Sequence, residues 1–87
     1  MKTVFKYPLK LESEPQEVLI PAGARFTFVA AQREQLCLWA EVDTEALLVV
    51  RRFAVHGTGH KIPLAQVWIG SVVMDSFVWH VYEASAR

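Results

Sequence analysis

The sequence has few of the features that mark the common functional classes of protein. It holds one cysteine in 87 residues, so no disulfide can form within the chain, which favours a reducing compartment. Nine basic residues balance nine acidic ones, whereas nucleic-acid-binding domains normally carry a basic excess. No apolar run approaches the roughly 20 residues that cross a bilayer, and the N-terminus lacks a signal-peptide core. These absences predict a cytoplasmic protein that binds neither nucleic acid nor a membrane.

The composition compensates for the small size of the chain, which allows a single domain over residues 1–87. A domain of this length buries only about 60–65% of its unfolded surface, so its stability is marginal. Hydrophobic residues make up 53% of the chain and aromatic residues 11%. Alternation along the strands places some of the aromatic side chains on a second face, where solvent would reach them. We therefore expect a homo-oligomer that covers this surface.

Alternating apolar and polar residues, separated by short polar or glycine-containing breaks, predict about seven short strands. No stripe with the 3.6-residue period of a helix is long enough to predict one. The pattern therefore favours an all-β fold, either a small antiparallel sandwich or a partly open barrel, with a frayed tail over Ala84–Arg87. The predicted strands are Phe5–Leu11, Gln16–Ile20, Arg25–Gln32, Leu36–Val42, Leu47–His56, Val67–Met74 and Phe77–Glu83.

Three positions predict details of these strands. Pro8 cannot donate a hydrogen bond to a neighbouring strand, so its strand should lie at a sheet edge or carry a bulge. Strict alternation places Phe26 and Phe28 on one face and Val29 on the other. Gly70 interrupts an apolar strand and indicates a bulge or a close approach of another segment.

The segment Arg51–Pro63 carries the densest chemistry in the chain. Its glycines could present successive backbone N–H groups to an anion, while Thr58 adds a hydroxyl and Lys61 a charge. The glycine spacing differs from that of a P-loop, and a plain turn after a strand explains the same residues. The candidate ligand-binding residues are Arg51, Arg52, His56, Gly57, Thr58, Gly59, His60 and Lys61.

The pair Arg51 and Arg52 separates these two interpretations. Adjacent strand residues face opposite sides of a sheet, so one of the two guanidinium groups should point inward. An inward arginine needs a carboxylate partner, and the preceding strand offers Glu41 or Asp43. An arginine that faces a ligand is the alternative.

No cofactor, metal site or catalytic site is predicted. His56 and His60 have a spacing that holds a metal on a helix, but two intervening glycines remove that geometry, and His80 lies far away. Cys37 sits in an apolar strand, where a thiol is usually inert packing. No serine lies in a nucleophile-elbow motif, so we expect the protein not to be an enzyme.

Four motifs carry a resemblance to a known family. They lie at residues 2–9 (KTVFKYPL), 36–43 (LCLWAEVD), 51–60 (RRFAVHGTGH) and 78–83 (VWHVYE). Through these motifs the chain resembles a family of small bacteriophage proteins known only as a domain of unknown function. The resemblance implies a phage origin and expression in the cytoplasm of a bacterial host, but it implies no activity and no functional residues.

Three functions are consistent with these observations. The leading hypothesis is a non-enzymatic binding module that acts on a host protein, for example as an antagonist of host defence. The second is a protein that sequesters a nucleotide signal or another anionic small molecule. The third is a structural component of a virion or of its assembly. By analogy alone, some small phage proteins antagonise host defence by binding a protein or by sequestering a nucleotide signal.

Overall fold

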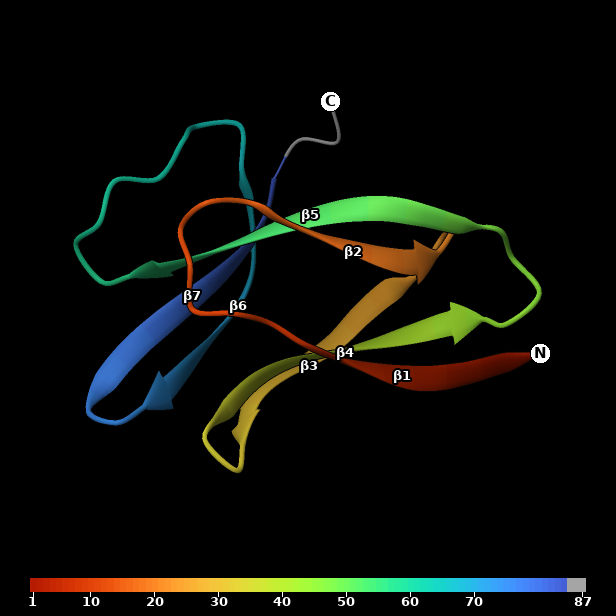
Figure 1. Ribbon diagram of the computed structural model, residues 1–87, viewed down its shortest axis with the longest axis horizontal. Coiled ribbons are helices and arrows are strands. Elements are labelled where there is room, and N and C mark those ends of the chain that lie inside the picture. The colour runs from red at the N-terminus through yellow and green to blue at the C-terminus, as the bar shows by residue number, and fades with distance from the viewer. Residues whose placement is uncertain (85–87) are drawn as a thin grey trace.

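Seven strands and no helix make up the part of the chain that the computed structural model describes, residues 1–84 (Figure 1). The predicted all-β class is therefore confirmed. The predicted frayed tail, Ala84–Arg87, lies outside the described residues except for Ala84, which is the last residue of β7. The strands are β1 (Lys2–Pro8), β2 (Gln16–Pro21), β3 (Arg25–Gln32), β4 (Gln35–Asp43), β5 (Leu48–Gly57), β6 (Val67–Met74) and β7 (Phe77–Ala84).

The strands form two antiparallel sheets. One has the order β1-β4-β3 and the other the order β2-β5-β7-β6. The sheets meet where the edge strand β3 lies against the edge strand β6. The molecule is flat, with extents of 39 × 31 × 15 Å. A sandwich or partly open barrel describes this arrangement, as the sequence predicts.

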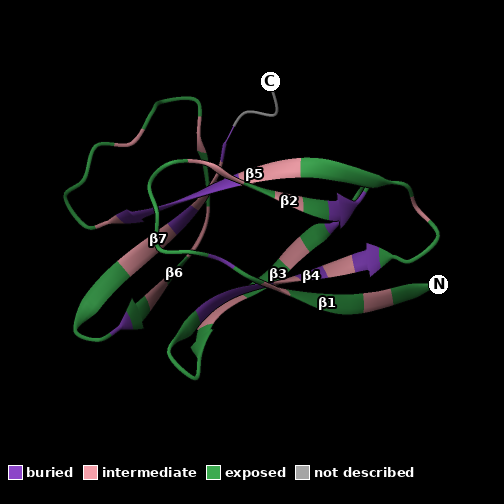
Figure 2. Cartoon of the chain, in the orientation of Figure 1, coloured by how far each residue is buried: buried purple, intermediate pink, exposed green. Residues whose placement is uncertain are grey.

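The core fills the space between the inner faces of the two sheets. Leu38 of β4, Ile20 of β2, Phe53 of β5 and Val81 of β7 are all fully buried there. Figure 2 shows that β5 changes along its length, from exposed at its start to buried over its second half. The end of β5 that leads into the glycine loop is therefore its most firmly held part.

The first strand differs from its prediction. It begins at Lys2 and ends at Pro8, rather than running from Phe5 to Leu11. The strand ends early because the side-chain amide of Gln16, from the start of β2, bonds both the N–H and the carbonyl of Lys10, at 2.9 Å each, and fixes a bend there. Pro8 lies on an edge strand, as predicted.

The predicted faces of β3 are wrong at Phe28. The pairing of β3 with β4 shifts between Phe26 and Phe28, which marks a bulge at Thr27. The extra residue turns Phe28 outward, where it is 60% exposed, while Phe26 and Val29 both pack on the core. A bulge of this kind breaks the two-residue period on which the prediction relied.

Gly70 lies at the meeting of the two sheets, and its predicted role is confirmed. The pairing of β6 with β7 shifts between Trp68 and Gly70, so β6 also carries a bulge. A Cβ atom on Gly70 would lie 2.9 Å from Cγ2 of Val29. Only glycine lets β6 approach β3 this closely.

Candidate binding site

The loop after β5 closes on itself in a tight turn. The N–H of His60 donates to the carbonyl of Gly57 at 3.1 Å, and Gly59 has a φ of +89° at the third position of this turn. These are the features of a type II turn, whose third position favours glycine. The N–H of Gly57 donates to Nδ1 of His60 at 3.2 Å, so this amide is already used within the loop.

A hydrogen-bonded network ties this loop to the outer face of the sheet. Thr58 Oγ1 lies 2.9 Å from Nε2 of His80, and His80 Nδ1 lies 2.7 Å from Oγ of Ser71. The indole N–H of Trp68 donates to the same serine oxygen at 3.0 Å. Ser71 and His80 are direct cross-strand partners on β6 and β7, so strand pairing itself brings them together. The imidazole is held between two hydroxyls, which fixes the position of Thr58.

His56 lies beneath the same loop and is 2% exposed. Its Nε2 lies 2.8 Å from Oε1 of Gln66, and its ring makes a T-shaped contact with the ring of Tyr82, with centroids 5.6 Å apart. Its Nδ1 is buried and has no hydrogen-bond partner. The Gln66 amide therefore provides the single hydrogen bond that satisfies this buried ring.

Replacing Gln66 with alanine is expected to lower the free energy of unfolding by about 1–2 kcal/mol, because both nitrogens of buried His56 then lack partners. Urea unfolding measures the change. Gln32→Ala serves as the control, since this amide bonds Lys6 at an exposed position and its loss should cost less than about 0.5 kcal/mol. Equal effects of the two substitutions would contradict the role given to Gln66.

A pocket of about 410 Å³ opens beside the loop. It forms because β7 starts at Phe77, whereas β5 ends opposite Trp79, so the first residues of β7 extend past the neighbouring strand. Phe77 is 64% exposed as a result, and its ring centroid lies 6.1 Å from that of Trp79. The pocket is lined by Gly57, Thr58, His60, Ser76, Phe77, Val78 and Trp79.

Arg51 does not belong to this pocket. Its guanidinium points to the inner face, where Nε and Nη2 donate to the two carboxylate oxygens of Glu83 at 2.6 and 2.7 Å. It also lies 4.5 Å from the ring centroid of Phe26, in a cation–π contact. The prediction of an inward arginine paired with a carboxylate is confirmed, but the partner is Glu83.

The two carboxylates predicted as possible partners of the inward arginine, Glu41 and Asp43, have other contacts. Glu41 lies 3.7 Å from Lys2 and 3.9 Å from Arg25. Asp43 accepts the backbone N–H of Glu45, and this bond lowers the pKa of its carboxyl. Both are outside the inner face because alternation along β4 gives that face to Leu38 and its neighbours of the same parity.

Of the eight residues predicted from the sequence, Gly57, Thr58 and His60 line the pocket. His56 is buried behind the loop, and Arg52 follows Arg51 on the opposite face of β5. Sequence reasoning missed the contribution of β7 and of the turn before it. The strand lengths carried no signal for this contribution, because the first residues of β7 extend past β5 only through the register in which the two strands pair. The pocket-lining residues missed are Ser76, Phe77, Val78 and Trp79.

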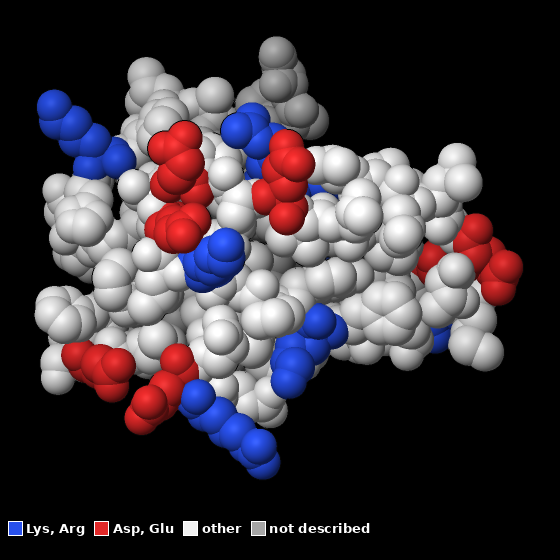
Figure 3. All heavy atoms as spheres, viewed as in Figure 1, with Lys and Arg blue, Asp and Glu red and all other residues white. Residues whose placement is uncertain are grey.

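Three further observations concern the surface charge, metal ligands and membrane spans. Figure 3 shows acidic and basic side chains interspersed on the visible face, with wide uncharged areas between them. Within residues 1–84, no three His, Cys, Asp or Glu side chains gather as a metal site requires. The same residues contain no helix that is long and apolar enough to cross a membrane.

The fold and the pocket define a small all-β protein with an aromatic-lined cavity beside a glycine turn. The chain belongs to the family described as "Domain of unknown function (DUF7352)", whose model matches residues 1–87. Membership of a family without a known function agrees with the expectation from the sequence. No curated protein and no solved structure matches the chain significantly.

Proposed function

We propose that the protein is a non-enzymatic binding module whose pocket beside the Gly57–His60 turn holds a flat, ring-bearing small molecule such as a nucleobase. The observation that carries this proposal is the pairing of two aromatic rings, Phe77 and Trp79, with hydroxyl and imidazole groups in one cavity. Stacking on an aromatic ring contributes roughly 1–3 kcal/mol per base. A volume of about 410 Å³ lies within the usual range for small-molecule sites.

The polar groups of the pocket would orient such a ligand. Thr58 and Ser76 offer hydroxyls, and His60 offers an imidazole. Lys61 follows His60 on the same loop and is exposed, so it supplies a positive charge for a ligand that carries a phosphate. This arrangement supports the nucleotide-signal hypothesis more than it supports an anion held by Arg51, whose guanidinium is occupied.

The Ser71–His80 pair is the nearest approach to a catalytic arrangement, and its contacts favour a structural role. A serine nucleophile needs a base that is oriented by a third group, commonly a carboxylate. Here the third group is the hydroxyl of Thr58, and Ser71 already accepts the indole N–H of Trp68. We therefore propose that the pair holds the loop in place.

Thermal unfolding with a panel of nucleosides and nucleotides tests the proposal. A ligand at ten times its Kd should stabilise the protein by roughly 1.4 kcal/mol, which raises Tm by about 6–11 °C. The double substitution Thr58→Val/His60→Ala should remove this shift, and Phe77→Ala should reduce it. Phe28→Ala is the matched control, because Phe28 is 60% exposed on the other sheet. The proposal fails if no compound in the panel raises Tm.

An exposed apolar patch favours a second candidate function, the binding of a partner protein. Leu19 of β2 and Val50 of β5 are direct cross-strand partners, and they are 58% and 47% exposed. Leu48, two residues before Val50 on the same face, is 61% exposed. Patches of this kind commonly mark protein interfaces. The occupant would be a host protein, as for a phage factor that antagonises host defence, or a second copy of the chain.

Mass measurement in solution and a pull-down from bacterial lysate test this second candidate. The substitutions Leu19→Ser and Val50→Ser should abolish oligomers or the captured protein, whereas Val73→Ser, at a 69% exposed position on β6, should have no effect. A monomer that captures the same proteins with and without the patch substitutions would contradict it.

A further inference from the structure

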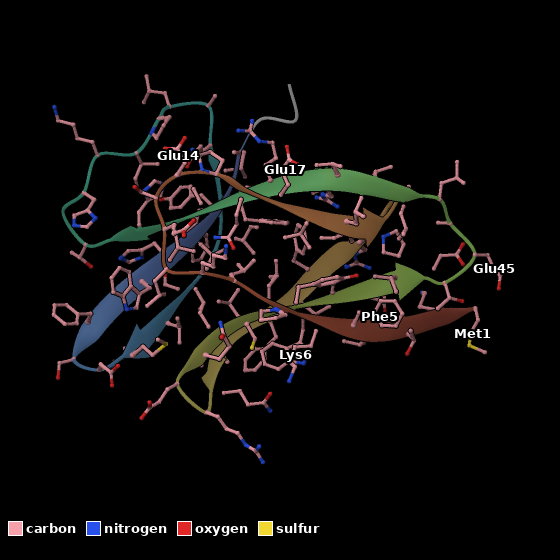
Figure 4. All side chains as sticks on the ribbon, in the orientation of Figure 1. Met1, Phe5, Lys6, Glu14, Glu17 and Glu45 are labelled. Carbon is pink, nitrogen blue, oxygen red and sulfur yellow. The ribbon has the colours of Figure 1, made fainter. Side chains whose placement is uncertain are left out.

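A second cavity lies on the sheet of β1, β4 and β3, whereas the glycine turn and its pocket belong to the sheet of β2, β5, β7 and β6. It has a volume of about 630 Å³ and lies where β1 passes the end of the β3–β4 hairpin. Figure 4 labels Lys6 on β1 beside this hairpin. The cavity is lined by Lys6, Pro8, Gln32, Arg33, Gln35 and Cys37.

The charged residues that line this cavity are all basic. Lys6 and Arg33 are both cationic, and none of the six lining residues is acidic. The amide oxygen of Gln32 accepts a hydrogen bond from Nζ of Lys6 at 2.7 Å, which holds the ammonium group at the cavity. Glu34, the remaining residue of the turn, is not part of the lining. Two cationic residues that line one hollow create a positive potential there.

The polar side chains beneath the cations are fixed in place. The amide nitrogen of Gln35 donates to the carbonyls of Leu9 and Leu36, at 2.8 and 3.0 Å. Cys37 is 2% exposed, and its thiol lies 3.5 Å from the carbonyl of Gln35. The floor of the cavity is therefore a rigid part of β4, as a binding site requires.

The turn that carries Arg33 has an unusual backbone for its sequence. Arg33 and Glu34 have φ values of +52° and +65°, the left-handed conformations of a two-residue hairpin turn. Asn-Gly suits such a turn, because Gly has no Cβ and the short polar side chain of Asn tolerates positive φ, whereas long side chains adopt it at an energetic cost. Strain of this kind is concentrated at functional sites. The other two-residue turn, Asp75-Ser76, also has positive φ values, and its Ser76 lines the loop pocket.

We propose that this cavity is an anion-binding site for a small molecule that carries a phosphate or carboxylate group. Arg33 would bind the group through its planar guanidinium, and Lys6 would add a second charge-assisted hydrogen bond. The site is separate from the pocket beside the Gly57–His60 turn, so it stands whether or not that pocket binds a ligand. It places the anionic ligand expected from the sequence on different residues.

Titration of ¹⁵N-labelled protein with inorganic phosphate, and separately with citrate, tests this proposal by NMR. The backbone amides of Gln32, Arg33, Gln35 and Cys37 should shift together and saturate, and the anion that saturates at lower concentration identifies the preferred group. Lys6→Gln and Arg33→Asn should each weaken binding about tenfold.

The control variants are Lys2→Gln and Arg25→Gln, which remove the same residue types from the same sheet, beside Glu41. They should leave the anion affinity unchanged. Equal weakening by the controls, or shifts that spread over the surface without saturating, would overturn the proposal. Thr58→Val/His60→Ala should retain phosphate binding, which separates this site from the loop pocket.

A further variant keeps loss of binding distinct from loss of folding. Arg33→Asn/Glu34→Gly should raise Tm, because it relieves the turn, and should still weaken phosphate binding about tenfold. A variant with a raised Tm and the wild-type phosphate affinity would overturn the role given to Arg33.

Discussion

Replacing Glu83 with alanine is expected to lower the free energy of unfolding by about 2–3 kcal/mol, because it leaves the Arg51 guanidinium without its carboxylate inside the fold. The two side chains are only 23% and 26% exposed. Arg51 also donates to the carbonyl of Ala24 at 3.1 Å and lies over the ring of Phe26, so it cannot easily turn toward solvent. Urea unfolding followed by tryptophan fluorescence measures the loss.

Glu41→Ala is the matched control for this prediction. Glu41 also contacts two cations, but at 3.7 and 3.9 Å from the well-exposed Lys2 and Arg25, so its loss should cost less than about 1 kcal/mol. Arg51→Met/Glu83→Leu removes both charges together and should recover most of the stability, because no unpaired charge remains. If Glu83→Ala were no more harmful than Glu41→Ala, the pair would not support the fold.

The Arg51–Glu83 pair shows that alternation along a strand predicts the face of a residue but not its partner. Alternation places Glu83 on the same face as Val81, and Arg51 on the same face as Phe53, so both charges can be assigned to the core from the sequence. Only the pairing of β5 with β7 shows that they meet. A partner chosen from the preceding strand in sequence was wrong because β4 belongs to the other sheet.

The strands themselves were predicted well, because their period of two and their turn residues are local signals. The predicted faces failed at Phe28, where a single extra residue at the bulge reverses the orientation of the next side chains along β3. The first strand was shifted because the Gln16 clasp on Lys10 involves a side chain from beyond the turn. The hydrophobic pattern reveals neither the bulge in β3 nor the hydrogen bonds between Gln16 and Lys10.

The two cavities differ in how many of their lining residues can be predicted from the sequence. The loop pocket includes the Gly57–His60 turn, whose glycines identify it, although the contribution of Phe77 depends on where β5 ends. The cavity at Lys6 and Arg33 is formed when the pairing of β1 with β4 brings Lys6 and Pro8 beside the β3–β4 hairpin. That pairing joins the first strand to the fourth, and no local pattern specifies it.

Gly70→Val is expected to lower the free energy of unfolding by about 2–3 kcal/mol, because it inserts a side chain into the contact between the two sheets. A Cβ atom at this position would lie 2.9 Å from Cγ2 and 3.2 Å from Cβ of Val29. Val29 is partly buried and packs on the core, and its short branched side chain cannot move aside. The sheets would have to separate where β3 meets β6. Urea unfolding measures the loss.

The sign of the change for Gly70→Ala decides whether this contact matters. Replacing an ordinary strand glycine with alanine raises the free energy of unfolding by about 0.5–1 kcal/mol, because the unfolded chain loses conformational freedom. The contact with Val29 predicts the opposite sign, a loss of about 1 kcal/mol. Val29→Ala makes room for the new methyl group, so the double variant Val29→Ala/Gly70→Ala should be more stable than the sum of the single effects. Additive effects, or a gain in stability from Gly70→Ala alone, would show that the two sheets are not held together at this glycine.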